Sequence, residues 1–168
     1  MLMCEFGYHF DRISNDEIIE VFVMILRDLQ LRDRIQVFAN APYVALIDTS
    51  VWSVLRCAMQ LLPCRCEGIR AQHLIVQHVE THLTAQLWNS HIPTSSGKTS
   101  NQRFTCKQQC VRYMANKCHV YRDHHGMPAP WVIAGDLNLP PGVLMHECQQ
   151  FILPDTHCMS KSNWVADN

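Results

Sequence analysis

The sequence predicts a single layered α/β domain. Short apolar runs typical of strands recur along the chain, and longer stretches have the spacing of amphipathic helices. No repeat, low-complexity tract or linker divides the 168 residues. Strands and helices mixed along one chain pack as layers around a common core, and this length is sufficient for one such domain.

The composition is that of a globular protein. With 48% hydrophobic and 17% charged residues, disorder is not expected. The 14 basic and 15 acidic residues almost cancel, so any contact with nucleic acid would have to be local. No apolar run approaches the ~20 residues of a membrane span, and the first residues lack the basic region of a signal peptide. We therefore expect an intracellular protein whose nine cysteines are reduced thiols.

The first half of the chain opens with a strand at residues 1–4, which ends at Glu5. Ser14 and Glu17 have capping-box spacing, which predicts the start of a helix, and apolar residues then follow helical spacing as far as Leu29. Strand-like apolar runs come next, at residues 35–39, 43–47, 74–79 and 84–90.

The second half adds two helices and a strand. A helix is expected over about residues 101–121, with Phe104, Val111, Met114 and Cys118 buried. The apolar run at residues 131–134, bounded by Gly and Pro residues, predicts a buried strand. A short helix fits residues 143–152, and the last sixteen residues show no clear period.

The segment Gly135-Asp136-Leu137-Asn138 follows the last strand and carries the strongest functional signal. Residues two apart in an extended chain point to the same side, so Asp136 and Asn138 converge at a strand end, where α/β folds often bind ligands. A plain Asx-turn is the alternative, because Asp and Asn favour local backbone bonds.

Polar residues also follow two other expected strands. Glu5 follows the first strand, and Asn89 and His91 lie at the end of the strand at residues 84–90. Taken singly, Glu5 could be a solvated loop residue, and His91 could be an ordinary surface or core histidine.

In this order, the three segments resemble the endonuclease/exonuclease/phosphatase family, which includes DNase I and the exonuclease III-type AP endonucleases. Leu2-Met3-Cys4-Glu5-Phe6-Gly7 is similar to the family's metal-binding Glu segment. Leu87-Trp88-Asn89-Ser90-His91-Ile92-Pro93 is similar to the central strand that delivers a His or an equivalent polar group. Residues 131–140 are similar to the family's Gly-Asp-Phe-Asn segment. Arg103 at the head of a helix is similar to a further feature of the family.

The resemblance spans residues 1–153 and leaves residues 154–168 as an irregular tail. It implies a partial four-layer α/β sandwich, in which two sheets pack face to face with helices outside.

The resemblance also implies metal-assisted hydrolysis of a phosphodiester, in a nucleic acid or another phosphate ester. Glu5 would hold Mg²⁺ or Mn²⁺, and Asp136 would orient or deprotonate the attacking water. Asn138 would donate a hydrogen bond to the phosphate, and Asn89 would hold phosphate or orient its neighbours. His91, as an imidazolium, would contact the phosphate or protonate the leaving group.

Two segments of the family have no counterpart. A strand delivering an Asn would precede Glu5, and an Asp-His pair would lie well beyond Asn138, whereas Asp155-Thr156-His157 comes too early and has the wrong spacing. The expectation is a chain truncated at both ends, with weak or absent hydrolysis alone. The alternatives are a catalytically inactive remnant that only binds or folds, and a small zinc-binding interaction module. The oligomeric state and the choice among phosphate esters stay open.

Overall fold

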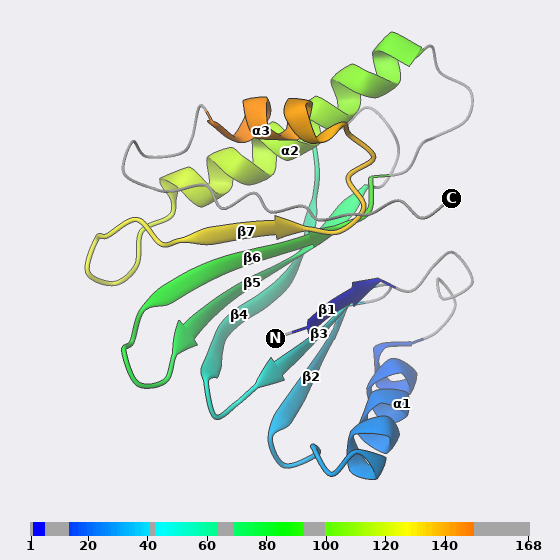
Figure 1. Cartoon of the computed structure of the whole chain (residues 1–168), viewed down its shortest axis with the longest axis vertical. Coiled ribbons are helices and arrows are strands. Elements are labelled where there is room, and N and C mark those ends of the chain that lie inside the picture. Colours follow the sequence, from blue (N-terminus) through cyan, green and yellow to red (C-terminus); the bar gives the residue numbers. More distant parts are fainter. Residues whose placement is uncertain (1, 6–13, 41–42, 64–68, 93–99, 150–168) are drawn as a thin grey trace.

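Two β-sheets and three helices make up the computed structural model (Figure 1). The structure describes residues 2–5, 14–40, 43–63, 69–92 and 100–149; the side chains of residues 2–5 and of Ser100, Arg103, Pro141 and Met145 are outside that description. The expected boundary at residue 153 and the Asp155-Thr156-His157 segment also lie outside the described residues.

The first sheet has three antiparallel strands in the order β1-β3-β2. The second sheet has four strands in the order β4-β5-β6-β7; its pairs are antiparallel except β6 and β7, which are parallel. The strands are β1 (Leu2–Glu5), β2 (Ile35–Asn40), β3 (Tyr43–Asp48), β4 (Trp52–Leu61), β5 (Arg70–His78), β6 (Thr84–Ser90) and β7 (Trp131–Ala134).

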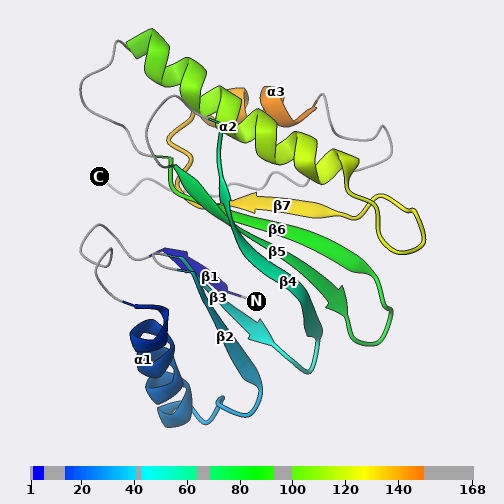
Figure 2. The ribbon, with the colours of Figure 1, turned by 180° about the vertical axis from the view of Figure 1, so that it is seen from behind.

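The sheets pack face to face, with helices on both outer sides. The core between the sheets contains Ala45 and Ile47 of β3 against Leu74 and Val76 of β5 and Leu87 of β6. Helix α1 (Asn15–Asp28) packs against β2, whereas α2 (Ser100–Val120) and α3 (Pro141–Gln149) cover the other face of the second sheet. The front and back views show the same four layers (Figure 1, Figure 2). The predicted four-layer sandwich is confirmed.

Local signals placed most elements correctly. The capping box at the start of α1 is present, since the Ser14 hydroxyl accepts from the Glu17 amide and the Glu17 carboxylate accepts from the Ser14 amide. The predicted long helix matches α2 within one residue at each end, and the predicted strand at residues 131–134 matches β7. That strand is not buried as predicted: it lies at the edge of its sheet, and Val132 is 53% exposed. No described helix is long and apolar enough to cross a membrane.

Two further expectations about the elements are wrong. The sequence predicts no strand at residues 52–61, where β4 runs, because a bulge between Val54 and Arg56 breaks the alternation of apolar and polar residues. Phe104 is 39% exposed rather than buried, although Val111, Met114 and Cys118 of the same helix are buried as predicted. Phe104 lies in the first turns of α2, which extend beyond the strands (Figure 1).

The expectation that every cysteine is a reduced thiol is also wrong. Cys106 is in a disulfide, whereas Cys57, Cys110, Cys118 and Cys148 are not. Sequence spacing alone cannot reveal such a pairing, because it depends on which segments meet in the fold.

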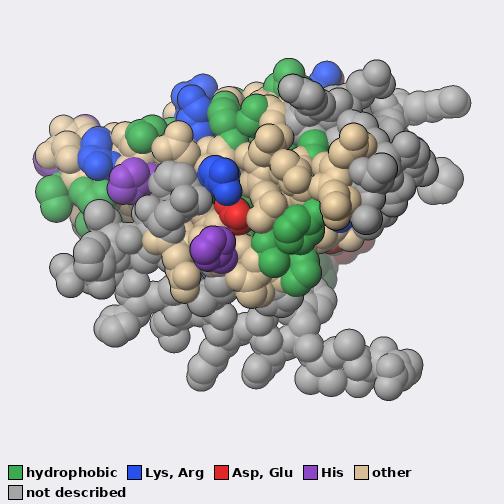
Figure 3. Space-filling model, turned by 90° about the horizontal axis from the view of Figure 1, so that it is seen from above, with side chains coloured by type: hydrophobic (Ala, Val, Ile, Leu, Met, Phe, Trp, Pro, Cys, Tyr) green, Lys and Arg blue, Asp and Glu red, His purple; other side chains and the backbone are tan. Residues whose placement is uncertain are grey.

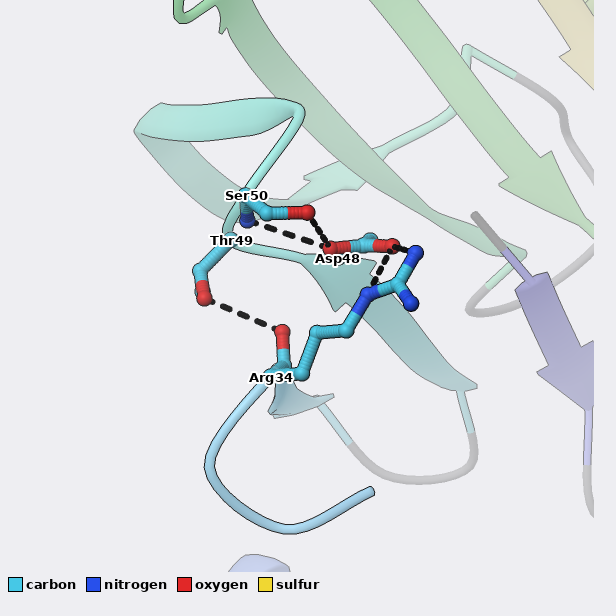
Figure 4. Close-up of polar contacts among 4 residues, drawn as sticks. All are labelled: Arg34, Asp48, Thr49 and Ser50. Atoms are coloured by element: carbon cyan, nitrogen blue, oxygen red, sulfur yellow. Dashed lines mark hydrogen bonds and ion pairs between the residues drawn. The ribbon is translucent and has the colours of Figure 1, made fainter.

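An ion pair closes one end of the β2–β3 pair. Arg34 donates from Nε to Oδ2 of Asp48 at 2.8 Å, and Asp48 Oδ1 accepts from the Ser50 hydroxyl and amide (Figure 4). Thr49 donates to the carbonyl of Arg34. The hydrogen bond from Arg34 is the largest cause that holds the pKa of Asp48 well below its usual range.

Replacing Asp48 with Asn is expected to lower the melting temperature at pH 7. Because the folded state lowers the pKa of Asp48, its contribution to stability is present above the unfolded pKa of about 4 and is lost as the pH falls further. Thermal melts should therefore show a difference between wild type and Asp48→Asn at pH 7 that shrinks at pH 3. Asp33→Asn is the control, because it removes a neighbouring negative charge that has no ion pair among the described residues. An equal pH dependence in both variants would contradict the assignment.

Candidate active site

The carboxyl ends of β6 and β7 meet at one edge of the second sheet. The two strands are parallel, with Asn89 opposite Ala134, and the Ile92 amide donates to the Asp136 carbonyl at 2.8 Å just beyond them. This pairing brings together the segments that carry Asn89, His91, Asp136 and Asn138, as the sequence predicts for strand ends on one side of a sheet.

Gly135 allows the second segment to approach the first. Its φ is +111°, and an added Cβ would lie 2.1 Å from the backbone carbonyl oxygen of Ser90. No side chain fits there without moving the backbone. The glycine of the Gly-Asp-x-Asn segment is therefore required by the approach of β6.

The turn at residues 136–138 is held by its own side chains. Asp136 Oδ1 accepts from the Asn138 amide at 3.1 Å, which is the Asx-turn bond, and Asn138 has a left-handed φ of +48°. The Asn138 side chain donates from Nδ2 to the Ile92 carbonyl at 2.9 Å. The Asx-turn is thus present, so the extended backbone assumed for residues 136–138 is wrong. The Asn138 side chain also ties the turn to the end of β6. Asp136 itself is exposed, so its carboxylate is accessible to solvent.

Tyr43 joins the first sheet to this edge of the second. It is 3% exposed, its hydroxyl donates to the Arg70 carbonyl at 3.0 Å, and the same oxygen accepts from the His91 amide at 3.1 Å. The backbone of Glu5 is paired with Tyr43 across β1 and β3. The strand end that carries Glu5 is therefore registered against the residue that holds His91. The Glu5 side chain lies outside the described residues, so its metal role stays a prediction.

Two buried amides line the inter-sheet side of this end. Gln72 and Asn89 are opposite each other on β5 and β6, and they are 0% and 2% exposed. Gln72 Nε2 donates across the gap to the Phe38 carbonyl and to Asn40 Oδ1 of β2, both at 3.2 Å. Asn89 is thus enclosed between the sheets, and its role as a phosphate ligand stays a prediction.

Tyr43 and Gln72 are not among the residues that the sequence singles out. Tyr43 begins an apolar run and Gln72 precedes one, so both look like ordinary strand residues. Their importance comes from strand register and from the opposing sheet, and neither is visible in local spacing.

The described residues do not form a zinc centre. No group of three or more His, Cys, Asp or Glu among them could hold a metal ion. His73 is stacked on Trp88 with ring centroids 4.1 Å apart. Burial, with a smaller effect from the charge of Arg56, lowers the pKa of His73 to about 4, so it is a neutral core histidine at pH 7.

Comparison with solved structures identifies the fold. Over 77% of this chain, the human Nocturnin catalytic domain with a bound sulfate anion matches with a TM-score of 0.53 and 15% identity. The fold is that of the endonuclease/exonuclease/phosphatase family. D. rerio TDP2 complexed with a single-strand DNA product has a TM-score of 0.52 and 16% identity over 77% of the chain. ANGEL2, a 2′,3′-cyclic phosphatase in complex with adenosine-2′,3′-vanadate, has a TM-score of 0.52 and 15% identity over 77%.

The chain spans about half the length or less of these structures: 53% of the Nocturnin chain, 48% of the TDP2 chain and 39% of the ANGEL2 chain. No family model matches the sequence, and no curated protein matches it. The fold that the resemblance implies is confirmed by the solved structures.

Proposed function

We propose that this chain is a metal-dependent phosphodiester-hydrolase-type domain that acts on nucleic acid or another phosphate ester. The meeting of the segments that carry His91 and Asp136-Leu137-Asn138 at one sheet edge of a nuclease-like fold carries the proposal. The sequence order of these residues matches the family's motifs, and a structural neighbour was solved with a single-strand DNA product.

The oxygen donors at this edge fit Mg²⁺ or Mn²⁺. Asp136 is exposed and offers a carboxylate, and Glu5 ends the strand that pairs with Tyr43. Mg²⁺ is typically held by one or two carboxylates and keeps several of its waters, so it does not need a cluster of three protein ligands. Such an ion would neutralise charge on the phosphoryl oxygens. With so few carboxylates, metal affinity and turnover of the 168-residue chain are expected to be low.

Three residues of the chain would activate the water, contact the phosphate and protonate the leaving group. Asp136 would orient the attacking water or accept its proton through the carboxylate oxygen that the Asx-turn does not use. Asn138 has one amide hydrogen committed to Ile92 and a second with which to contact phosphate. His91, whose amide is fixed by Tyr43, would contact the phosphate or give a proton to the leaving oxygen.

A binding-only domain is the second candidate. One carboxylate oxygen of Asp136 and one amide hydrogen of Asn138 are already used to hold the turn, which favours a structural use of these residues. Such a domain would bind a phosphate ester without cleaving it.

The test is cleavage of a single-stranded oligonucleotide by the whole chain with Mg²⁺ and with chelator. We expect slow Mg²⁺-dependent turnover that Asp136→Asn lowers by about 100-fold or more, because general acid–base catalysis contributes that much. The amide oxygen of Asn can still accept from the Asn138 amide, so the turn should persist.

Asp123→Asn is the matched control. Asp123 also accepts backbone amides, those of His125 and Met127, in a turn between α2 and β7. Turnover that Asp136→Asn and Asp123→Asn lower equally would refute the assignment. Oligonucleotide binding without turnover in the wild type would establish the binding-only candidate instead.

A further inference from the structure

Helix α2 contacts the turn after β7 at one point and helix α3 at another. At the first point, Lys107 donates from Nζ to the Asn138 carbonyl at 2.9 Å. At the second, Gln108 and Arg112 donate to the carboxylate of Glu147 on α3, each at 2.9 Å. One stretch of α2, little more than a turn long, thus contacts both the Gly-Asp-x-Asn turn and helix α3, which follows it.

The Lys107 contact falls on the least regular residue of that turn. Asn138 has a φ of +48°, which costs a non-glycine residue free energy unless its surroundings hold it. Its amide, side chain and carbonyl are all engaged, by Asp136, Ile92 and Lys107 in that order. Only the bond from Lys107 comes from outside the two strand ends. It is also the only one of the three that carries a formal positive charge on the donor, which strengthens a hydrogen bond.

The contacts of α2 with α3 and with the core set the position of α2 relative to the turn. Glu147 is 1% exposed, so the pairs that anchor α3 to α2 are shielded from water on the acidic side. The core beneath them includes Val111 and Met114 of α2 packed with Leu137 of the turn itself. Lys107 therefore extends from a helix whose position relative to the turn is set independently.

We propose that Lys107 is a positioning residue that holds Asn138 in its left-handed conformation and so orients the Asp136 carboxylate for phosphodiester chemistry. The catalytic part of this inference rests on the proposed function; the conformational part does not. Lys107 acts through the turn and does not need to touch the substrate.

The primary experiment is amide hydrogen exchange on the whole chain with Lys107→Met. Loss of a charge-assisted hydrogen bond, discounted for partial exposure, should accelerate exchange of the Asn138 amide about tenfold. Amides in the middle of the second sheet, such as Leu74, should not change. Lys107→Arg keeps a charged donor and should restore slow exchange.

Lys117→Met is the matched control, because it removes the same group ten residues further along α2, where the ammonium lies over the Tyr113 ring 5.4 Å from its centroid. It should leave the Asn138 amide unchanged. The proposal is overturned if Lys107→Met leaves Asn138 exchange at the wild-type rate, or accelerates exchange of Asn138 and Leu74 alike.

Hydrolysis supplies the second readout. In a chain that cleaves oligonucleotide, Lys107→Met should lower kcat about tenfold with KM nearly unchanged, because substrate contacts remain while the carboxylate is misplaced. An unchanged kcat beside accelerated exchange would overturn the catalytic part. A wild-type chain without turnover would count against the proposed function alone, since the exchange result stands without it.

Discussion

Replacing Gly135 with alanine is expected to destabilise the protein by about 3–5 kcal/mol, the sum of backbone strain and an enforced steric shift. The φ of +111° is outside the region that a residue with a Cβ adopts at low cost, and that Cβ would meet the Ser90 carbonyl oxygen at 2.1 Å. The clash is with backbone, so no side-chain rotation can relieve it. Urea denaturation of wild type and Gly135→Ala gives the difference.

Substitutions at two other glycines separate the cost of backbone strain from the cost of the steric clash. Gly126 has a φ of +76° but open space around its Cβ position, so Gly126→Ala should cost only the strain, about 1 kcal/mol. Gly142 lies in α3 with open space and no positive φ, so Gly142→Ala should be neutral or stabilise by up to about 1 kcal/mol. If Gly135→Ala costs no more than Gly126→Ala, the close approach of β6 does not constrain the turn.

The elements that the sequence predicts correctly are those specified by local chemistry. Ser14 and Glu17 can form a capping box without help from distant residues, and the short apolar run at 131–134 favours a strand. The burial predicted for that strand is wrong, because β7 lies at the edge of its sheet. Strand β4 escapes prediction because its bulge is made with a partner strand. The pattern of one strand cannot reveal a change of register that arises between two.

In the candidate site too, some residues can be predicted from local sequence and others cannot. Asp136 and Asn138 are predictable because their spacing and the preceding strand are contiguous in sequence, and the Asx-turn bond between them is local. The role of Tyr43 cannot be predicted from the sequence pattern, because it depends on the meeting of the two sheets. Tyr43 and His91 are 48 residues apart in sequence. Such long-range contacts carry no period that a window of residues could detect.

Arg112→Met is expected to cost about 2–3 kcal/mol, because it removes the charged donor of a buried carboxylate, to which Gln108 still donates. Glu147 has a side chain 2% exposed, whereas that of Arg112 is 54% exposed. Figure 3 shows the face formed by α2 and α3, on which basic side chains are visible in several places and acidic surface is small. The arginine can return to water when the pair is broken, but the glutamate cannot.

Because Glu147 is buried and Arg112 is half-exposed, the two single variants of a double-mutant cycle are expected to lower stability by unequal amounts. Glu147→Met should cost less than Arg112→Met, because it removes the group that is expensive to bury and leaves a half-exposed arginine. The double variant should be close in stability to Glu147→Met alone, which gives a coupling energy of about 2 kcal/mol. Urea denaturation of the four proteins measures it, with Lys117→Met as a surface control within about 0.5 kcal/mol of wild type. Equal costs for the two single variants would mean that water reaches Glu147 when Arg112 is absent. In that case, packing of Leu144 and Cys148 against the core would be the main attachment of α3 to α2.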